Sequence, residues 1–260
     1  MALPARDSGN RAGPGPFGGM TGRRHIFVGT AGWSISSRHA GEFAGDGTHL
    51  ERYCRRLDAV EINSSFYRPH RRETYERWAR AVPEDFSFSV KLPKSITHER
   101  RLTDCGQLLH EFLSQVGGLG AKLGVILVQL PPSLRFDAAA APAFLAGLRS
   151  RTEAGLALEP RHESWFDESV NAELEKHRIA RVAADPARAP DADRPSGWSG
   201  LAYFRLHGSP EIYRSDYAGR LDEISRQLKR TPAPRIWCIF DNTMESHALG
   251  NAVALAAMLR

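Results

Sequence analysis

Hydrophobic residues recur in eight short runs along the chain, and most runs are followed by a segment with helical periodicity. The runs are typical of β-strands and cover residues 25–30, 59–63, 86–91, 124–129, 155–159, 181–185, 202–207 and 236–241. The helical segments are 48–57, 71–82, 107–116, 143–150, 168–176, 216–229 and 245–259. Residues 186–200 contain three prolines and two glycines, so we expect an irregular loop in place of a helix after the sixth strand.

Eight strands that alternate with helices predict an α/β protein with a parallel sheet, and eight such units predict closure into a (β/α)8 TIM-type barrel. An open doubly wound sheet is the alternative. The GTAGW segment in the first strand does not have the glycine spacing of a dinucleotide-binding loop, which favours the barrel. We expect one barrel domain over residues 25–260 and a disordered leader, rich in Gly, Pro and Arg, over residues 1–24.

Alternation within the predicted strands separates an apolar face from a polar one. Every second side chain of a strand shares a face, and Val60 and Ile62 are typical of the apolar face, which suits packing against outer helices. The other face ends in polar or charged side chains in seven of the eight strands. These side chains are Glu61, Asn63, Lys91, Gln129, Glu159, Arg161, Asp185, Arg205, His207 and Asp241. Because isolated buried charges are costly, this ring must either pair internally or bind a ligand, at the end where barrel enzymes have their active sites.

The densest group of reactive side chains follows the fifth strand, in the segment EPRHESW of residues 159–165. Arg161 suits bidentate binding of a phosphate or carboxylate. Trp165 suits stacking on a sugar or a base, and His162 is a candidate proton carrier. Glu61 and Glu159 are the acid/base candidates, and two inward carboxylates also suit glycoside hydrolysis.

Two further loops carry candidate ligand-binding residues. Lys91 ends the third strand, where a lysine can form a Schiff base, bind an anion or pair with Glu61, and His98 follows on the loop. The loops after strands seven and eight commonly bind phosphate in barrels. Here they contribute Gly208, Ser209, Tyr213, Asn242 and Thr243, although simple turn formation explains Asn242 equally well.

Charge and cysteine content narrow the function classes. The chain has 35 Lys+Arg and 30 Asp+Glu in 260 residues, a net charge of +5, and residues 25–260 contain 31 basic and 29 acidic groups. Because the domain is nearly balanced, a broad phosphate footprint on nucleic acid is not favoured. Three cysteines without a C-x-x-C pair indicate neither a disulfide framework nor a structural zinc, which predicts a cytoplasmic protein. No membrane-spanning segment is present.

The same side chains include candidate ligands for a divalent metal. Its ligands would be Glu61, Glu159, His162, Asp185, His207 and Asp241. No H-x-H or H-E-x-x-H spacing accompanies them, so the sequence leaves the metal unassigned.

Taken in order, the segments VGTAGW, VEINSSFYR, FSVKLPKSITH, KLGVILVQLPPS, LALEPRHESW, AADP, YFRLHGSPEIY and IFDNT resemble domain-of-unknown-function family 72, the YecE-like proteins. The resemblance runs from about residue 26 to the C-terminus. It implies a TIM-type barrel and no established reaction.

The sequence therefore predicts a barrel protein that binds a phosphorylated or otherwise anionic ligand at its C-terminal mouth, and phosphoester hydrolysis is the leading reaction class. Arg161 and Arg205 are expected to hold the anion. Glu61, Glu159 and Asp241 are the expected acids and bases, with His162 or His207 as proton carrier. The alternatives are a non-catalytic nucleic-acid-binding module and a carbohydrate-active barrel that uses the paired glutamates. The oligomeric state is left open.

Overall fold

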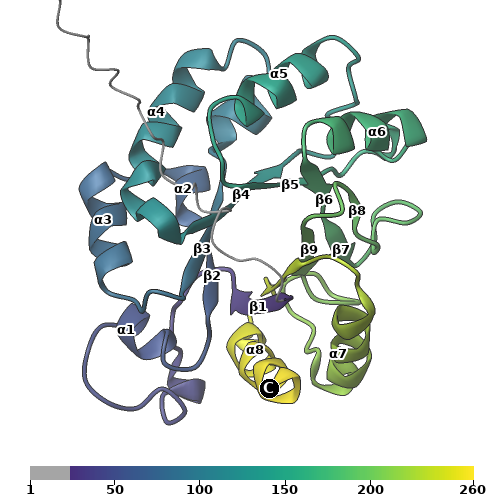
Figure 1. Cartoon of the computed structure of the whole chain (residues 1–260). Helices are drawn as coiled ribbons and strands as arrows, with labels where there is room; N and C mark the ends of the chain where they lie inside the picture. The colour runs from purple at the N-terminus through teal and green to yellow at the C-terminus, as the bar shows by residue number, and fades with distance from the viewer. Residues whose placement is uncertain (1–23) are drawn as a thin grey trace, which may run out of the picture.

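The computed structural model describes residues 24–260 of the chain. The predicted leader, residues 1–24, lies outside this part except for Arg24. The strands are arranged in a ring, and the helices lie on its outer side (Figure 1). This arrangement is the predicted TIM-type barrel.

Ten short strands form two sheets within the described residues. The first sheet is parallel, in the order β1 (His25–Thr30), β10 (Arg235–Phe240), β9 (Ala202–Leu206) and β7 (Ala183–Asp185). The second has the order β2 (Ala59–Ile62), β3 (Ser87–Lys91), β4 (Leu123–Gln129), β5 (Gly155–Glu159), β6 (Ile179–Arg181) and β8 (Ser196–Gly197), in which β8 is antiparallel to β6. All eight predicted strands are present, and the predicted sixth strand is divided into β6 and β7.

The two sheets adjoin at both of their edges. Ala31 and Glu61 form a bridge just beyond the end of β1, next to β2. At the other edge only Val182 separates β6 from β7, so one length of chain passes from one sheet into the other. A glycine is needed at position 29, because a Cβ atom there would lie 2.1 Å from the carbonyl oxygen of Ala59. The backbone of β1 can therefore approach β2 closely enough to complete the ring.

Eight α-helices lie outside the strands in the described part of the chain. They are α1 (His49–Tyr53), α2 (Ser64–Tyr67), α3 (Arg72–Arg80), α4 (Gly106–Val116), α5 (Ala140–Arg149), α6 (Glu168–Lys176), α7 (Leu221–Arg230) and α8 (His247–Leu259). Helix α7 begins later than predicted, because the Asp216 carboxylate accepts the N–H of Ala218 and the side-chain amide of Asn251 and so holds a turn there. Helix α2 was not predicted, since four residues are too few to show a helical period.

Residues 186–201, between β7 and β9, contain no helix, as their proline and glycine content predicted, but the short strand β8 lies within this predicted loop. A groove of about 860 Å³ lies beside this loop on the outside of the barrel. Asp185, Ser209 and Arg220 are among the residues that line this groove.

Strand parity divides the buried apolar side chains into two groups. Val60, Ile62 and their equivalents on other strands belong to a large core between strands and helices. A second, smaller core fills the inside of the barrel and includes Phe27, Val125 and Trp237. These inward residues belong to the N-terminal and middle parts of their strands, so the polar strand ends rest on an apolar base.

Two expectations from composition are met within residues 24–260. None of the helices there has the length and apolar character needed to cross a membrane. The three cysteines, Cys54, Cys105 and Cys238, are free thiols.

Candidate functional site

Arg205 is the centre of the polar layer at the C-terminal end of the barrel. Its guanidinium is fully buried and contacts three carboxylates. It donates to Glu61 from Nε (3.0 Å) and Nη2 (2.7 Å), to Glu159 from Nη1 (2.5 Å) and to Asp241 from Nη2 (3.0 Å). These acids come from β2, β5 and the end of β10, so one cation joins opposite sides of the ring. Most of its donors are already used, which leaves Arg205 poorly placed to hold an external anion.

His207 lies beside Arg205 and connects two of the same carboxylates. Its Nδ1 is 3.0 Å from Asp241 and its Nε2 is 3.1 Å from Glu159. Burial favours the neutral ring, but the two carboxylates outweigh it and raise the pKa of His207. Since both ring nitrogens face acceptors, the imidazolium form satisfies both contacts.

The cations also set the protonation of the acids. Burial alone would raise the pKa of Glu159, but Arg205 and His207 hold it well below its usual range. The pKa of Asp241 is lowered for the same reason, again against burial. Gln129 donates to Glu159 as well (3.2 Å). The carboxylates of Glu159 and Asp241 are therefore ionised at neutral pH.

Lys91 is the cation of this region without a comparable partner. Its ammonium lies 4.2 Å from the centroid of the Phe66 ring, and the residue is only 8 % exposed. The ammonium makes neither a hydrogen bond nor an ion pair with residues 24–260, while the backbone carbonyl of Lys91 accepts from Ser65 Oγ (2.7 Å). Burial and the nearby charge of Arg205 lower the pKa of Lys91 to about 8, although Glu61, Glu159 and Asp241 act in the opposite direction.

Arg161, His98 and Tyr213 lie near the rim of the same polar layer. Arg161 contacts Glu159 through Nε and Nη2, both at 3.2 Å, and also interacts with the Tyr213 hydroxyl. The Tyr213 ring packs edge-on against His207, with 5.9 Å between centroids. Burial lowers the pKa of His98, and the charges of Lys91 and Arg161 lower it further. The three basic side chains of Lys91, Arg161 and His98 therefore lie at one side of the barrel mouth.

Several predicted site residues lie elsewhere, and Trp165 is the clearest correction. It is completely buried in the outer core, donates from Nε1 to the carbonyl of Leu134 (2.9 Å) and packs edge-on against Phe136. It is therefore not placed to stack on a ligand. His162 contacts Ser164 at the start of a 3-10 turn, η4 (Glu163–Trp165), and lies outside the network around Arg205.

Asp185 and Ser209 line the outer groove instead of the barrel mouth. Asp185 pairs with Leu206, which points outward, and its carboxylate accepts from Arg220 at 2.6 Å. The N–H of Gly208 donates to the Tyr217 hydroxyl (3.0 Å), so this backbone group is not open to a ligand.

The residues predicted after the eighth strand have structural contacts. Asn242 is buried and donates to the carbonyl of Ser215 and to Asn251. Thr243 is exposed and does not cap α8, whose N-cap is Ser246. At the end of β2, Asn63 is the N-cap residue of α2, and its buried Oδ1 has no hydrogen-bond partner among residues 24–260.

Two aromatic residues of the site, Tyr203 and Phe66, were not predicted from the sequence. The Tyr203 hydroxyl is 2.8 Å from both Glu61 and Ser89, beneath the network. It shares the inward parity of Arg205 on β9, so strand alternation was a signal for it. Phe66, under Lys91, lies in the unpredicted helix α2 and had no such signal.

The side chains do not fit a metal ion. Within residues 24–260 no group of three or more His, Cys, Asp or Glu side chains is placed to hold one. The carboxylates of the predicted ligand set accept from Arg205 or Arg220 instead, and His162 and Asp185 lie apart from the rest.

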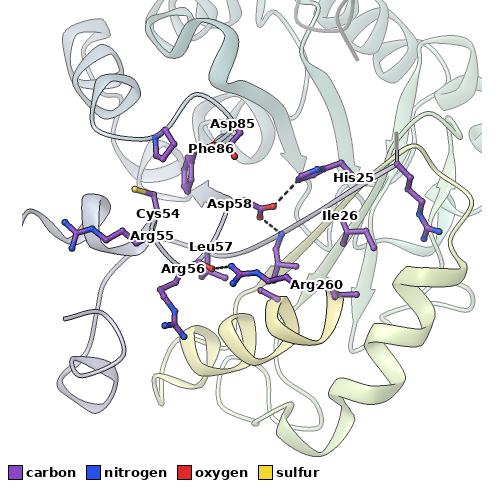
Figure 2. A pocket seen from close by; sticks show the side chains of 15 residues that line it. His25, Ile26, Cys54, Arg55, Arg56, Leu57, Asp58, Asp85, Phe86 and Arg260 are labelled. Atoms are coloured by element: carbon purple, nitrogen blue, oxygen red, sulfur yellow. Dashed lines mark hydrogen bonds and ion pairs between the residues drawn. The ribbon is translucent and has the colours of Figure 1, made fainter. Parts of the chain in front are cut away.

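A separate cavity of about 680 Å³ lies at the opposite end of the barrel, near the N-terminal ends of β1 and β2 (Figure 2). Asp58 contacts the His25 ring (3.1 Å) and the N–H of Val28 (3.0 Å) there. Arg260 reaches the carbonyl of Arg56 (3.4 Å). These polar groups serve the joint between β1 and β2, and barrel residues at this end usually serve stability.

One known protein family matches nearly all of the described part of this chain. The family described as "Protein of unknown function DUF72" matches residues 27–260. The chain belongs to the DUF72 family. YecE of Escherichia coli, described as a UPF0759 protein, is 31% identical over 178 residues, and the match spans 65% of this chain and 62% of the relative. YunF of Bacillus subtilis, also described as a UPF0759 protein, is 28% identical over 275 residues, covering 90% of this chain and 94% of the relative.

Solved structures of DUF72 proteins share the fold. A DUF72 protein of Enterococcus faecalis superimposes with a TM-score of 0.76 at 21% identity, over 90% of this chain and 95% of the other. One from Thermotoga maritima gives a TM-score of 0.72 at 26% identity, over 90% and 98%. The fold of this chain, a barrel predicted from its strand pattern, is therefore the fold of these solved DUF72 proteins.

Proposed function

We propose that the C-terminal mouth of this DUF72 barrel binds a small ligand that carries a phosphate or carboxylate group. One observation carries the proposal. The ammonium of Lys91, a residue only 8 % exposed, has no hydrogen bond within residues 24–260, and the charges of Lys91 and Arg161 both act on a further basic side chain, His98. A buried cation without a counter-charge in contact is unfavourable unless a ligand supplies one.

The charge balance of the layer supports an anionic ligand. The layer contains three acids, which are Glu61, Glu159 and Asp241, and three cations, which are Arg161, Arg205 and Lys91. His207, whose pKa is raised, is a fourth basic group. With His207 protonated, four cations face three anions, which leaves one net positive charge. Arg161 adds planar geometry that suits phosphate and carboxylate oxygens.

The layer also contains groups that suit proton transfer next to the bound anion. His207 lies between two ionised carboxylates that raise its pKa, and it is the candidate acid. For a phosphate ester this arrangement suits protonation of a leaving oxygen, with Lys91 and Arg161 near the phosphoryl charge. Phosphoester hydrolysis is thus the first reaction to assay, and the proposal of binding does not depend on it.

The two alternative functions have less support. Stacking on nucleic acid relied on Trp165, which is buried. A glycosidase requires one carboxyl group that stays protonated. Glu159 does not meet that requirement, because Arg205 and His207 keep its pKa low in spite of burial, and both carboxylate oxygens of Glu61 accept hydrogen bonds from Arg205.

The proposal is tested by calorimetric titration of the full chain with inorganic phosphate, alongside Arg161→Met and a control, Arg72→Met. Arg72 also pairs with a glutamate, Glu76, but on the exposed surface of α3. We expect saturable binding in the wild type and in Arg72→Met, and at least about a tenfold weaker affinity in Arg161→Met, since a charge-assisted contact is worth ~1.5–3 kcal/mol. Equal affinity in all three proteins, or no binding in any, would refute the proposed site.

A further inference from the structure

Lys91 differs from every other lysine of the chain. The sequence has five lysines and 30 arginines, so arginine is the usual cation of this protein. Lys94 and Lys176 pair with glutamates, and Lys122 and Lys229 donate to backbone carbonyls. A residue that only had to supply fixed positive charge at the mouth could equally be arginine.

A lysine amine is a nucleophile when it is unprotonated and its lone pair is not engaged. The Lys91 amine is buried at the end of β3 against the Phe66 ring, and no acceptor among residues 24–260 holds its protons. Burial and Arg205 lower the pKa of Lys91 to about 8, against the opposing charges of Glu61, Glu159 and Asp241. The charges of Lys91 and Arg161 both lower the pKa of His98, so these three basic groups lie in one region of the mouth. Desolvation and neighbouring cations are the two means by which proteins activate lysine.

We infer that Lys91 forms a Schiff base with an aldehyde or ketone that carries a phosphate or carboxylate group. This inference rests on the proposed anion site, because Arg161 and His98 would hold the anionic group while the carbonyl carbon faces Lys91. It also names the class of ligand: a phosphorylated carbonyl compound or an oxo acid.

The chemistry balances without an oxidant or reductant. The lone pair of Lys91 Nζ adds to the carbonyl carbon, and a proton passes from nitrogen to the carbonyl oxygen to give a carbinolamine. The hydroxyl group takes one proton from solvent and leaves as water, while the nitrogen lone pair forms the C=N bond. Amine, carbonyl compound and one proton give a protonated imine and water.

The test is reductive trapping with full-length protein and two matched probes, glycolaldehyde phosphate and uncharged glycolaldehyde. Sodium borohydride reduces any imine to a stable amine, and peptide mass mapping then identifies the modified lysine in the wild type. We expect a single adduct on Lys91 with glycolaldehyde phosphate, little with glycolaldehyde, and competition by inorganic phosphate. The yield should rise with pH through about 8 as the amine loses its proton.

Lys91→Arg should abolish the adduct, whereas Lys94→Arg, which alters the exposed lysine nearest in sequence, should leave it unchanged. An adduct spread over the surface lysines would overturn the inference. Phosphate binding without any adduct on Lys91 would overturn the Schiff base and leave the anion site standing. Absence of both binding and adduct would refute the two together.

Discussion

Replacing Lys91 with methionine should stabilise the protein at neutral pH. The substitution keeps most of the side-chain volume and removes a buried charge that has neither a hydrogen bond nor an ion pair within residues 24–260. A lysine that belonged to a structural ion network would behave in the opposite way, because its removal would leave a carboxylate without a partner.

The magnitude follows from the pKa. Burial, with Arg205, lowers the pKa of Lys91 from 10.5 to about 8, and each pKa unit corresponds to ~1.4 kcal/mol. Holding the charged form in the folded state therefore costs about 3 kcal/mol at pH 7. The contact with the Phe66 ring returns ~0.5–1 kcal/mol. We expect Lys91→Met to raise the free energy of unfolding by about 2 kcal/mol.

The pH dependence has a definite sign. Because the folded pKa is lowered, wild-type stability rises relative to the variant from about pH 8 upward, as the folded state loses its proton first. The advantage of Lys91→Met should disappear near pH 10.5, the ordinary pKa of a lysine exposed to solvent in the unfolded chain. Urea unfolding of both proteins at pH 7 and pH 10 measures this difference.

Lys122→Met is the matched control, because the Lys122 ammonium donates to the carbonyls of Ala79 (2.6 Å) and Val82 (2.5 Å). It should destabilise by about 1–3 kcal/mol, since those carbonyls lose a charged donor. If Lys91→Met destabilised the protein as Lys122→Met does, or if its effect did not change with pH, the reasoning on Lys91 would fail.

Three more predictions concern the rest of the barrel. Arg205→Met leaves three buried carboxylates without their shared cation and should lower the free energy of unfolding by about 3–5 kcal/mol in urea titrations; a loss below 1 kcal/mol would contradict its central place. Trp165→Ala should cost ~3–5 kcal/mol through a core cavity yet leave the calorimetric affinity for phosphate intact, whereas loss of binding in a folded variant would return Trp165 to the site. The pKa of His207 is raised, because Glu159 and Asp241 outweigh burial, so its contribution is complete below the unfolded pKa of ~6.5 and is lost as pH rises through the folded value. Wild-type stability should therefore fall relative to His207→Gln as pH increases from 6 to 9, and parallel stability curves would count against the imidazolium.

The strand pattern predicted the barrel and the inner members of the site for a physical reason. Side chains alternate strictly along a strand, so inward positions on different strands must meet inside a closed ring. Glu61, Glu159, Arg205 and His207 were placed by this rule, and the structure brings them within hydrogen-bond distance of one another.

Loop residues could not be placed in the same way, since no period fixes their direction. Trp165 points into the outer core, where its indole N–H donates a hydrogen bond to the carbonyl of Leu134. Asp185 is a strand residue that alternation was expected to point inward, but it lies on the outward parity of β7, where Arg220 from the region before α7 reaches it. The sequence also could not show which cation would have its donors taken up by carboxylates. Arg205 and Lys91 were both predicted to bind the ligand, and they differ in that Arg205 contacts carboxylates whereas the Lys91 ammonium does not.

The most direct test of the account is nuclear magnetic resonance of protein labelled with 13C at the lysine Cε, because the chain has only five lysines. One signal, absent in Lys91→Arg, should titrate near pH 8 in the free protein. Inorganic phosphate should shift that signal and move its titration to higher pH, since a bound anion stabilises the ammonium. If the signal that is absent in Lys91→Arg neither titrated near pH 8 nor responded to phosphate, Lys91 would not be part of an anion site at the barrel mouth.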